Sequence, residues 1–167
     1  QSEEKIRKDD EENFLFRIKS SSGATPGDYE IPYTLEYTQG SNEKTERGTI
    51  GLTILANPEL EFVLSSETPV QGMKGKIDLK IINKGLFDAR FVSVKVNNPE
   101  GISILSEDKI YVGTIDSDDF ESVDFDVIFN SLNPIFLATI EYRDFDNELI
   151  KENIELPIKV YTVGEAT

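Results

Sequence analysis

The stretch Gly75-Lys76-Ile77-Asp78-Leu79-Lys80-Ile81-Ile82-Asn83 decides the fold. From Lys76 to Ile81, charged and apolar residues alternate one by one. Successive side chains of a β-strand point to opposite faces, so Ile77, Leu79 and Ile81 share an apolar face and the charged residues share the other. The stretch therefore predicts a strand with one face in a core and one face in water.

The same alternation recurs in short segments separated by Gly, Pro, Asn and Asp, and no long segment places apolar residues at helical spacing. This pattern indicates an all-β sandwich rather than helices alternating with strands. Residues 144–148 are predicted to form a tight hairpin connection. Seven strands are predicted after residue 57: Glu59 to Leu64, Gly75 to Asn83, Ala89 to Val96, Lys109 to Ile115, Phe120 to Phe129, Ile135 to Arg143 and Glu148 to Tyr161.

An internal repeat relates the start of the chain to these strands. Residues 6–18 align without a gap with residues 115–127, an offset of 109. Residues 35–37 align with 140–142 at an offset of 105, and the apolar positions of residues 50–54 align with those of 154–158 at 104. A period of about 105 residues is the size of one immunoglobulin-like sandwich. Chance similarity between alternating strands is the competing explanation, and the matching order of three segments argues against it.

The repeat predicts two domains. Residues 1–56 are interpreted as the last three strands of one immunoglobulin-like sandwich, and residues 57–167 as a complete sandwich. Three strands cannot cover their own apolar face, so we expect the first part to pack on the complete domain, on a neighbouring repeat or on a second copy of the chain. Pro32 and Pro157 fall within predicted strands, and because proline cannot donate a ladder hydrogen bond, both predict an edge strand or a bulge.

Composition excludes several kinds of chemistry. The 167 residues include no His, Cys or Trp and carry a formal charge of −15. Without His and Cys there is no disulfide, no Cys/His zinc site and no nucleophile activated by histidine or thiol. The negative charge disfavours nucleic acid and anionic membranes, because phosphate binding needs clustered Lys and Arg. No apolar run approaches the roughly 20 residues of a membrane span, and a start at Gln1 without a signal peptide leads us to expect a processed or excised piece.

Two motifs carry a family resemblance. The stretch Ala24-Thr25-Pro26-Gly27-Asp28-Tyr29-Glu30-Ile31-Pro32-Tyr33-Thr34-Leu35-Glu36-Tyr37 resembles a segment of prokaryotic immunoglobulin-like tandem repeats, the group that includes CARDB-like, glycosidase-associated and archaeal S-layer-related domains. Residues 77–85 resemble the segment that opens the same modules. Residues 113–121 resemble the turn of that family but replace its Pro-Gly with acidic residues and Ser. The resemblance implies an extracytoplasmic tandem protein of a prokaryotic cell surface, and it carries over no catalytic residue.

Acidic loops offer the one candidate metal site. Calcium takes six to eight oxygen ligands, and Asp144, Asp146 and Glu148 supply carboxylates at alternate positions of one turn. The central Gly and terminal Glu of an EF-hand loop are missing at the required offsets. The competing interpretation is a solvated turn, since Asp and Asn favour turns through their own backbone hydrogen bonds. A second acidic group, between residues 116 and 126, is open to the same two interpretations.

An enzyme would need paired carboxylates as acid and base, since no histidine is present. Sandwich glycosidases normally use aromatic platforms for sugars, whereas this chain has no Trp and places most Tyr and Phe on predicted core faces; Tyr111 and Tyr161 are the exceptions, with exposed positions expected. The sequence therefore predicts a non-catalytic structural or interaction module of a cell-surface or secreted protein, without a cofactor. The alternative is an accessory carbohydrate-binding module of a larger enzyme.

Overall fold

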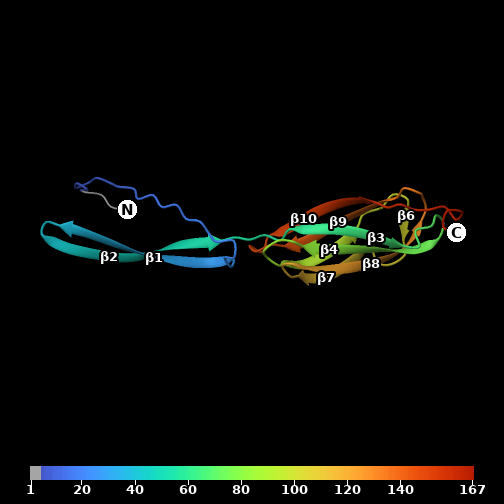
Figure 1. Cartoon of the computed structure of the whole chain (residues 1–167), viewed down its shortest axis with the longest axis horizontal. Coiled ribbons are helices and arrows are strands. Elements are labelled where there is room, and N and C mark those ends of the chain that lie inside the picture. Colours follow the sequence, from blue (N-terminus) through green and yellow to red (C-terminus); the bar gives the residue numbers. More distant parts are fainter. Residues whose placement is uncertain (1–4) are drawn as a thin grey trace. The chain divides into compact units, whose positions relative to one another are not determined.

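The chain is all-β, as the alternating pattern predicts. A computed structural model describes residues 5–167, and within them ten strands and no helix are formed (Figure 1). The chain divides into two compact units, Gln1–Ile54 and Leu55–Thr167. We call them the amino-terminal and the carboxy-terminal unit.

The carboxy-terminal unit is a sandwich of two antiparallel four-stranded sheets. One sheet has the order β3-β4-β8-β6, formed by Leu60–Glu67, Lys74–Asn83, Asp119–Phe129 and Ile102–Ile104. The other has the order β10-β9-β5-β7, formed by Leu149–Pro157, Ile135–Arg143, Ala89–Val96 and Lys109–Ile115. The two sheets share one hydrophobic core.

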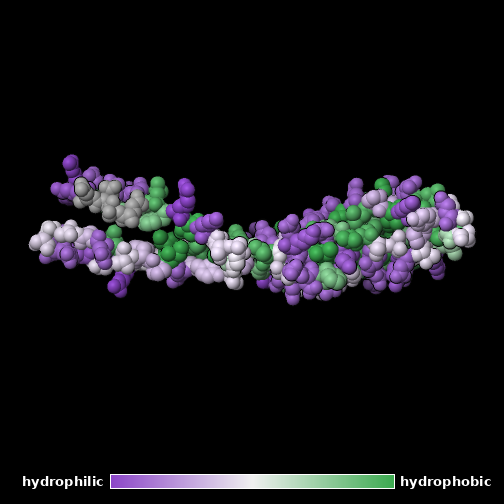
Figure 2. All heavy atoms as spheres, in the orientation of Figure 1, coloured by the Kyte–Doolittle hydropathy of each residue, from purple (hydrophilic) through white to green (hydrophobic). Residues whose placement is uncertain are grey.

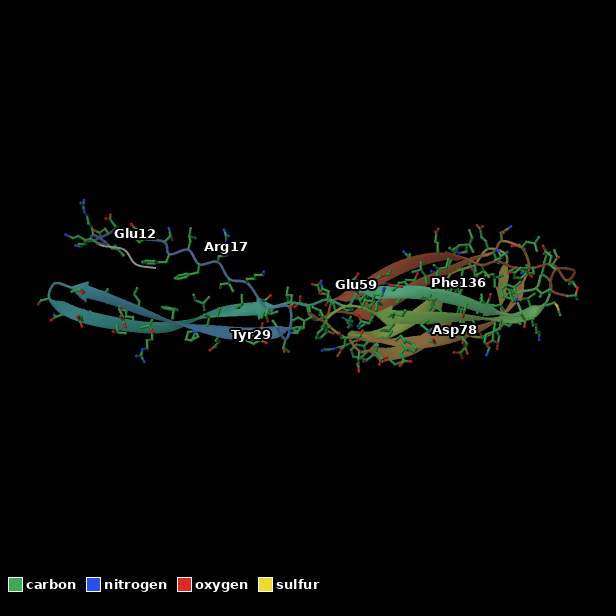
Figure 3. All side chains as sticks on the ribbon, viewed as in Figure 1. Glu12, Arg17, Tyr29, Glu59, Asp78 and Phe136 are labelled. Atoms are coloured by element: carbon green, nitrogen blue, oxygen red, sulfur yellow. The ribbon has the colours of Figure 1, made fainter. Side chains whose placement is uncertain are left out.

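The core consists of the inward-facing residues of both sheets. Ile77, Leu79 and Ile81 of β4 are fully buried, as their alternation predicts. The ring centroids of Phe125 in β8 and Phe136 in β9 lie 5.7 Å apart, so this contact joins one sheet to the other. Figure 3 labels Phe136. Burying a large apolar side chain contributes roughly 1.5–3 kcal/mol, so these alternating positions supply most of the driving force for folding.

All seven strands predicted in this unit are present, and an eighth, β6, was not predicted. It has three residues and pairs with the end of β8. Three residues carry too little alternation to distinguish a strand from a loop. The predicted connection at residues 144–148 is confirmed as the turn between β9 and β10.

The prediction of three strands in the amino-terminal unit is wrong. The unit has one hairpin of two strands, β1 (Gly27–Gln39) and β2 (Asn42–Ile54), joined by Gly40 and Ser41. Residues 5–26 contain no strand, although residues 6–18 match part of the second unit in sequence. A strand needs a neighbour for its backbone hydrogen bonds, and alternation alone does not provide one.

Both prolines occupy the edge positions predicted for them. Pro32 lies in β1, which pairs with β2 alone, and Pro157 is the last residue of the edge strand β10. Neither position requires a donor on both sides of the strand.

A fully buried asparagine, Asn83, ties together one end of the sandwich. Its amide nitrogen donates to the carbonyl oxygens of Phe87 (2.9 Å) and Ile115 (3.0 Å). Its side-chain oxygen accepts from the backbone amides of Glu59 (3.2 Å) and Gly85 (3.0 Å). One side chain thus links the end of β4 to the segment before β3, the turn before β5 and the end of β7.

Gly85 beside it is required by space. A Cβ at this position would lie 2.5 Å from the backbone nitrogen of Glu59. Any larger residue would therefore push the segment before β3 away from Asn83. The spacing of Asn83 and Gly85 therefore has a packing explanation in this fold.

We predict that Asn83→Ala lowers the free energy of unfolding of the carboxy-terminal unit by about 3 kcal/mol. The substitution leaves buried backbone donors and acceptors without partners, at roughly 1–3 kcal/mol each. Urea unfolding measures the effect. Asn153→Ala, at an exposed position that accepts one hydrogen bond from Thr139, is the control and should change stability by less than about 0.5 kcal/mol. Equal effects of the two substitutions would contradict the role given to Asn83.

Candidate functional site

The three predicted calcium ligands lie in the turn between β9 and β10. Asp144 is half-buried, and Asp146 and Glu148 are exposed. The Asp144 carboxylate accepts a hydrogen bond from the Glu148 backbone amide at 2.9 Å, and the Asp144 carbonyl accepts one from the Asn147 amide at 3.1 Å. The oxygens of Asp144 therefore already hold the turn together, which is the usual role of Asp in such a connection.

These carboxylates do not form a ligand cluster. Across residues 5–167, no group of three or more acidic side chains comes together in a way that could hold a metal ion. In the other acidic loop, the Asp119 carboxylate accepts from the Phe120 amide at 2.8 Å, and the Asp118 amide donates to the carbonyl of Asn83 at 2.9 Å. Asp144 and Asp119 thus each accept a hydrogen bond from the backbone of their own loop.

We predict that 5 mM calcium leaves the melting temperature unchanged relative to the chain in EDTA. A ligand that binds only the native state must stabilise it by mass action, so a bound ion would raise the melting temperature. An increase that disappears in Asp144→Asn would contradict this expectation and establish the calcium site.

A carboxylate pair that the sequence did not single out lies on the outer face of the β3-β4-β8-β6 sheet. Asp78 of β4 stands directly opposite Asp124 of β8 (Figure 3 labels Asp78). Partial burial raises the pKa of the Asp78 carboxyl, and the hydrogen bond with Asp124 and the charge of Asp124 raise it further. Lys76 approaches Asp124 to 3.5 Å, and Lys80 offsets part of the repulsion on Asp78.

The raised pKa of Asp78 predicts a pH-dependent cost. The folded state binds this proton more tightly than the unfolded state, so the group favours folding at low pH and loses that contribution as the pH rises through its folded pKa. Like charges directly opposite each other in a sheet destabilise it.

We therefore predict that Asp78→Asn raises the melting temperature at pH 7 and has little effect at pH 3. Asp146→Asn removes the same charge in an exposed turn and serves as the control for the overall charge of −15. Equal stabilisation by both substitutions at pH 7 would show that the Asp78 pair has no specific effect.

A groove at one end of the sandwich does not have the lining of a sugar site. Val96, Pro99, Ile102 and Ile104 line it together with Asn98, Ser106, Glu107 and Asp108. None of these has an aromatic ring, the group that usually stacks on sugars. Tyr111 and Tyr161 are exposed, as predicted, and Tyr161 lines a second groove together with Pro157 and Lys159.

The candidate interaction surface is the apolar face of the β1–β2 hairpin. Residues paired across the hairpin share a face, so Tyr29, Ile31, Tyr33, Leu35 and Tyr37 lie on one side together with Ile50 and Leu52. Five of them, Tyr29, Tyr33, Leu35, Tyr37 and Ile50, are 38–52% exposed. Figure 2 colours each residue of the chain by its hydropathy. The same face carries Gly48, Glu46 and Lys44 toward the hairpin turn, and the opposite face carries mainly Thr and charged residues. The hairpin is therefore built to bury one face, and nothing within its own two strands covers it; we call this face the open face.

Comparison of the sequence with known families and curated proteins finds no match. Residues 5–167 contain no helix able to cross a membrane. The chain is therefore defined by its fold: an all-β protein with one closed sandwich and one hairpin with an open apolar face.

Proposed function

We propose that the chain is a non-catalytic interaction module of a prokaryotic cell-surface or secreted protein built from immunoglobulin-like repeats. The open face carries the proposal: an amphipathic hairpin with one uncovered apolar face is suited to assembly with another β-structure. Exposed apolar patches of this kind mark interaction surfaces in soluble proteins.

The strand order supports an immunoglobulin-like sandwich. In the carboxy-terminal unit β3, β4 and β8 lie in one sheet, and β5, β9 and β10 lie in the other. This is the arrangement of strands A, B and E against C, F and G in immunoglobulin-like domains.

A local contact in the amino-terminal unit points the same way. The Tyr29 hydroxyl, at the start of β1, donates to the backbone carbonyl of Thr25 at 2.6 Å. Immunoglobulin-like domains often have such a tyrosine near the start of strand F, with its hydroxyl bonded a few residues upstream. This contact supports the interpretation of β1 as a strand F.

Surface location has a direct test in the source organism. A membrane-impermeant amine reagent applied to intact cells should label exposed lysines of this protein, such as Lys44 and Lys151, while a cytoplasmic protein of the same cells stays unlabelled. Labelling that appears only after the cells are broken would contradict an extracytoplasmic location.

A further inference from the structure

The β1–β2 hairpin has the same register as the β9–β10 hairpin. Leu35 pairs with Glu46, and Ile140, 105 residues further along, pairs with Glu152, which is 106 residues after Glu46. Because both ladders are antiparallel and regular, an offset of 105 for the first strand fixes an offset of 106 for the second along the whole length of β9 and β10. The sequence alignment of the second strand at 104 is therefore two residues out of register with the strand pairing.

A matching diagonal hydrogen bond fixes this correspondence. The Tyr37 hydroxyl donates to the Glu46 carboxylate at 3.1 Å, and the Tyr142 hydroxyl donates to the Glu152 carboxylate at 2.5 Å. In each hairpin the bond joins the tyrosine to the residue two places beyond its direct partner. In an alignment at an offset of 104, Glu46 would correspond to Ile150, and the two tyrosine–glutamate hydrogen bonds would no longer match.

The side chains across the hairpins are complementary in size. Tyr33 lies against Gly48, where a Cβ would come within 2.5 Å of the tyrosine hydroxyl oxygen. The corresponding pair in the second hairpin is Ala138 and Ile154. In the first hairpin the large residue is in the first strand, and in the second hairpin it is in the second strand. Each pair can therefore fill a similar space between two layers.

Pro32 fits the correspondence as well. It matches Leu137, which lies just outside the ladder of β9 with β5, since that ladder runs from Ala138 to Arg143. Toward β5, the carbonyl oxygen of Leu137 accepts a hydrogen bond from the Asn97 amide at 2.9 Å. Proline keeps its carbonyl, so β1 can accept a neighbouring strand as β9 does.

The two hairpins differ in what covers them. Phe136, Ala138, Ile140 and Tyr142 are at most 4% exposed, because the opposite sheet covers β9 and β5 pairs with its edge. Of their counterparts, Tyr33, Leu35 and Tyr37 are 38–48% exposed and Ile31 is half-buried. The amino-terminal hairpin thus resembles β9–β10, but no second sheet covers its apolar face.

A second copy of the chain is a poor cover for the open face. At about 200 Å² for each large side chain, the five exposed residues offer roughly 440 Å². Two such faces would bury about 900 Å² in total, below the roughly 1,200–2,000 Å² of stable interfaces. Each copy also carries a charge of −15, which opposes self-association.

We propose that the open face binds a β-sandwich segment built like β3–β8, which adds an antiparallel strand to the free edge of β1 and lays an apolar sheet over the face. The hairpin then closes a second sandwich as β9–β10 closes the first. This inference deepens the proposed function by naming the chemistry of the partner. It does not depend on cell-surface location, so intact-cell labelling and the experiment below can fail independently.

The test supplies such a segment from the chain itself. In the fusion, a copy of residues 55–134 is followed directly by residues 30–167. Glu30 is the junction because it corresponds to Ile135, the residue that follows 134 in the chain. Lys44 and Arg47 in β2 are exposed trypsin sites in the full chain, and the fusion should be cleaved there at least tenfold more slowly. Within the fusion, Leu35→Asp on the open face should restore cleavage, and Thr34→Asp on the opposite face should not. Unchanged cleavage in the fusion would overturn the proposal, as would a full chain that sediments as a dimer with these sites protected.

A second variant covers the case in which the added segment fails to fold. In the full chain, Ile135–Arg143 is replaced by the sequence of residues 30–38 and Leu149–Pro157 by that of residues 43–51, the register of the strand pairing. The control uses residues 45–53 in β10, the register of the 104 alignment. The first exchange should fold with the higher melting temperature. A first exchange that does not fold, or that is no more stable than the control, would overturn the proposal.

Discussion

A β-sheet with one apolar face needs a second layer over that face, and most of this structure follows from that constraint. In the carboxy-terminal unit the two sheets cover each other, and most of the longer strands alternate apolar and polar residues as a result. The same constraint leaves the charged residues on the outer faces, where pairs such as Asp78 and Asp124 meet at a cost. The charge of −15 is thus largely a property of outer faces and turns.

The constraint also explains why two similar hairpins differ in burial. A hairpin fixes its own register and the face on which each side chain lies, but two strands cannot supply the layer above them. Tyr142 and Tyr37 make the same bond to a glutamate, and only the first is buried. Burial therefore depends on the remaining strands of the sandwich, since the same hairpin pattern occurs with and without a second layer.

Alternation in the sequence was sufficient to predict the all-β class, seven strands of the carboxy-terminal unit and the edge positions of Pro32 and Pro157. It failed where the outcome depends on a neighbour in space. Residues 14–18 alternate without forming a strand, and β6 is too short to show a period. The network of Asn83 and the contact of Asp78 with Asp124 join residues distant in sequence, so no local pattern reveals them. The sequence left the segment of Asp144 open to two interpretations, a calcium site and a solvated turn, and its hydrogen bonds are those of a turn.

Amide hydrogen exchange of the 167-residue chain tests the central claim most directly, because it compares the two hairpins in one molecule. If the amino-terminal hairpin lacks its second layer, the cross-strand amides of β1 and β2 open locally and exchange on the order of a thousandfold faster than those of β9 and β10. The amides of β9 and β10 should exchange only on global unfolding of their unit. Equal protection of the two hairpins would contradict the account, since it would show that the open face is already covered.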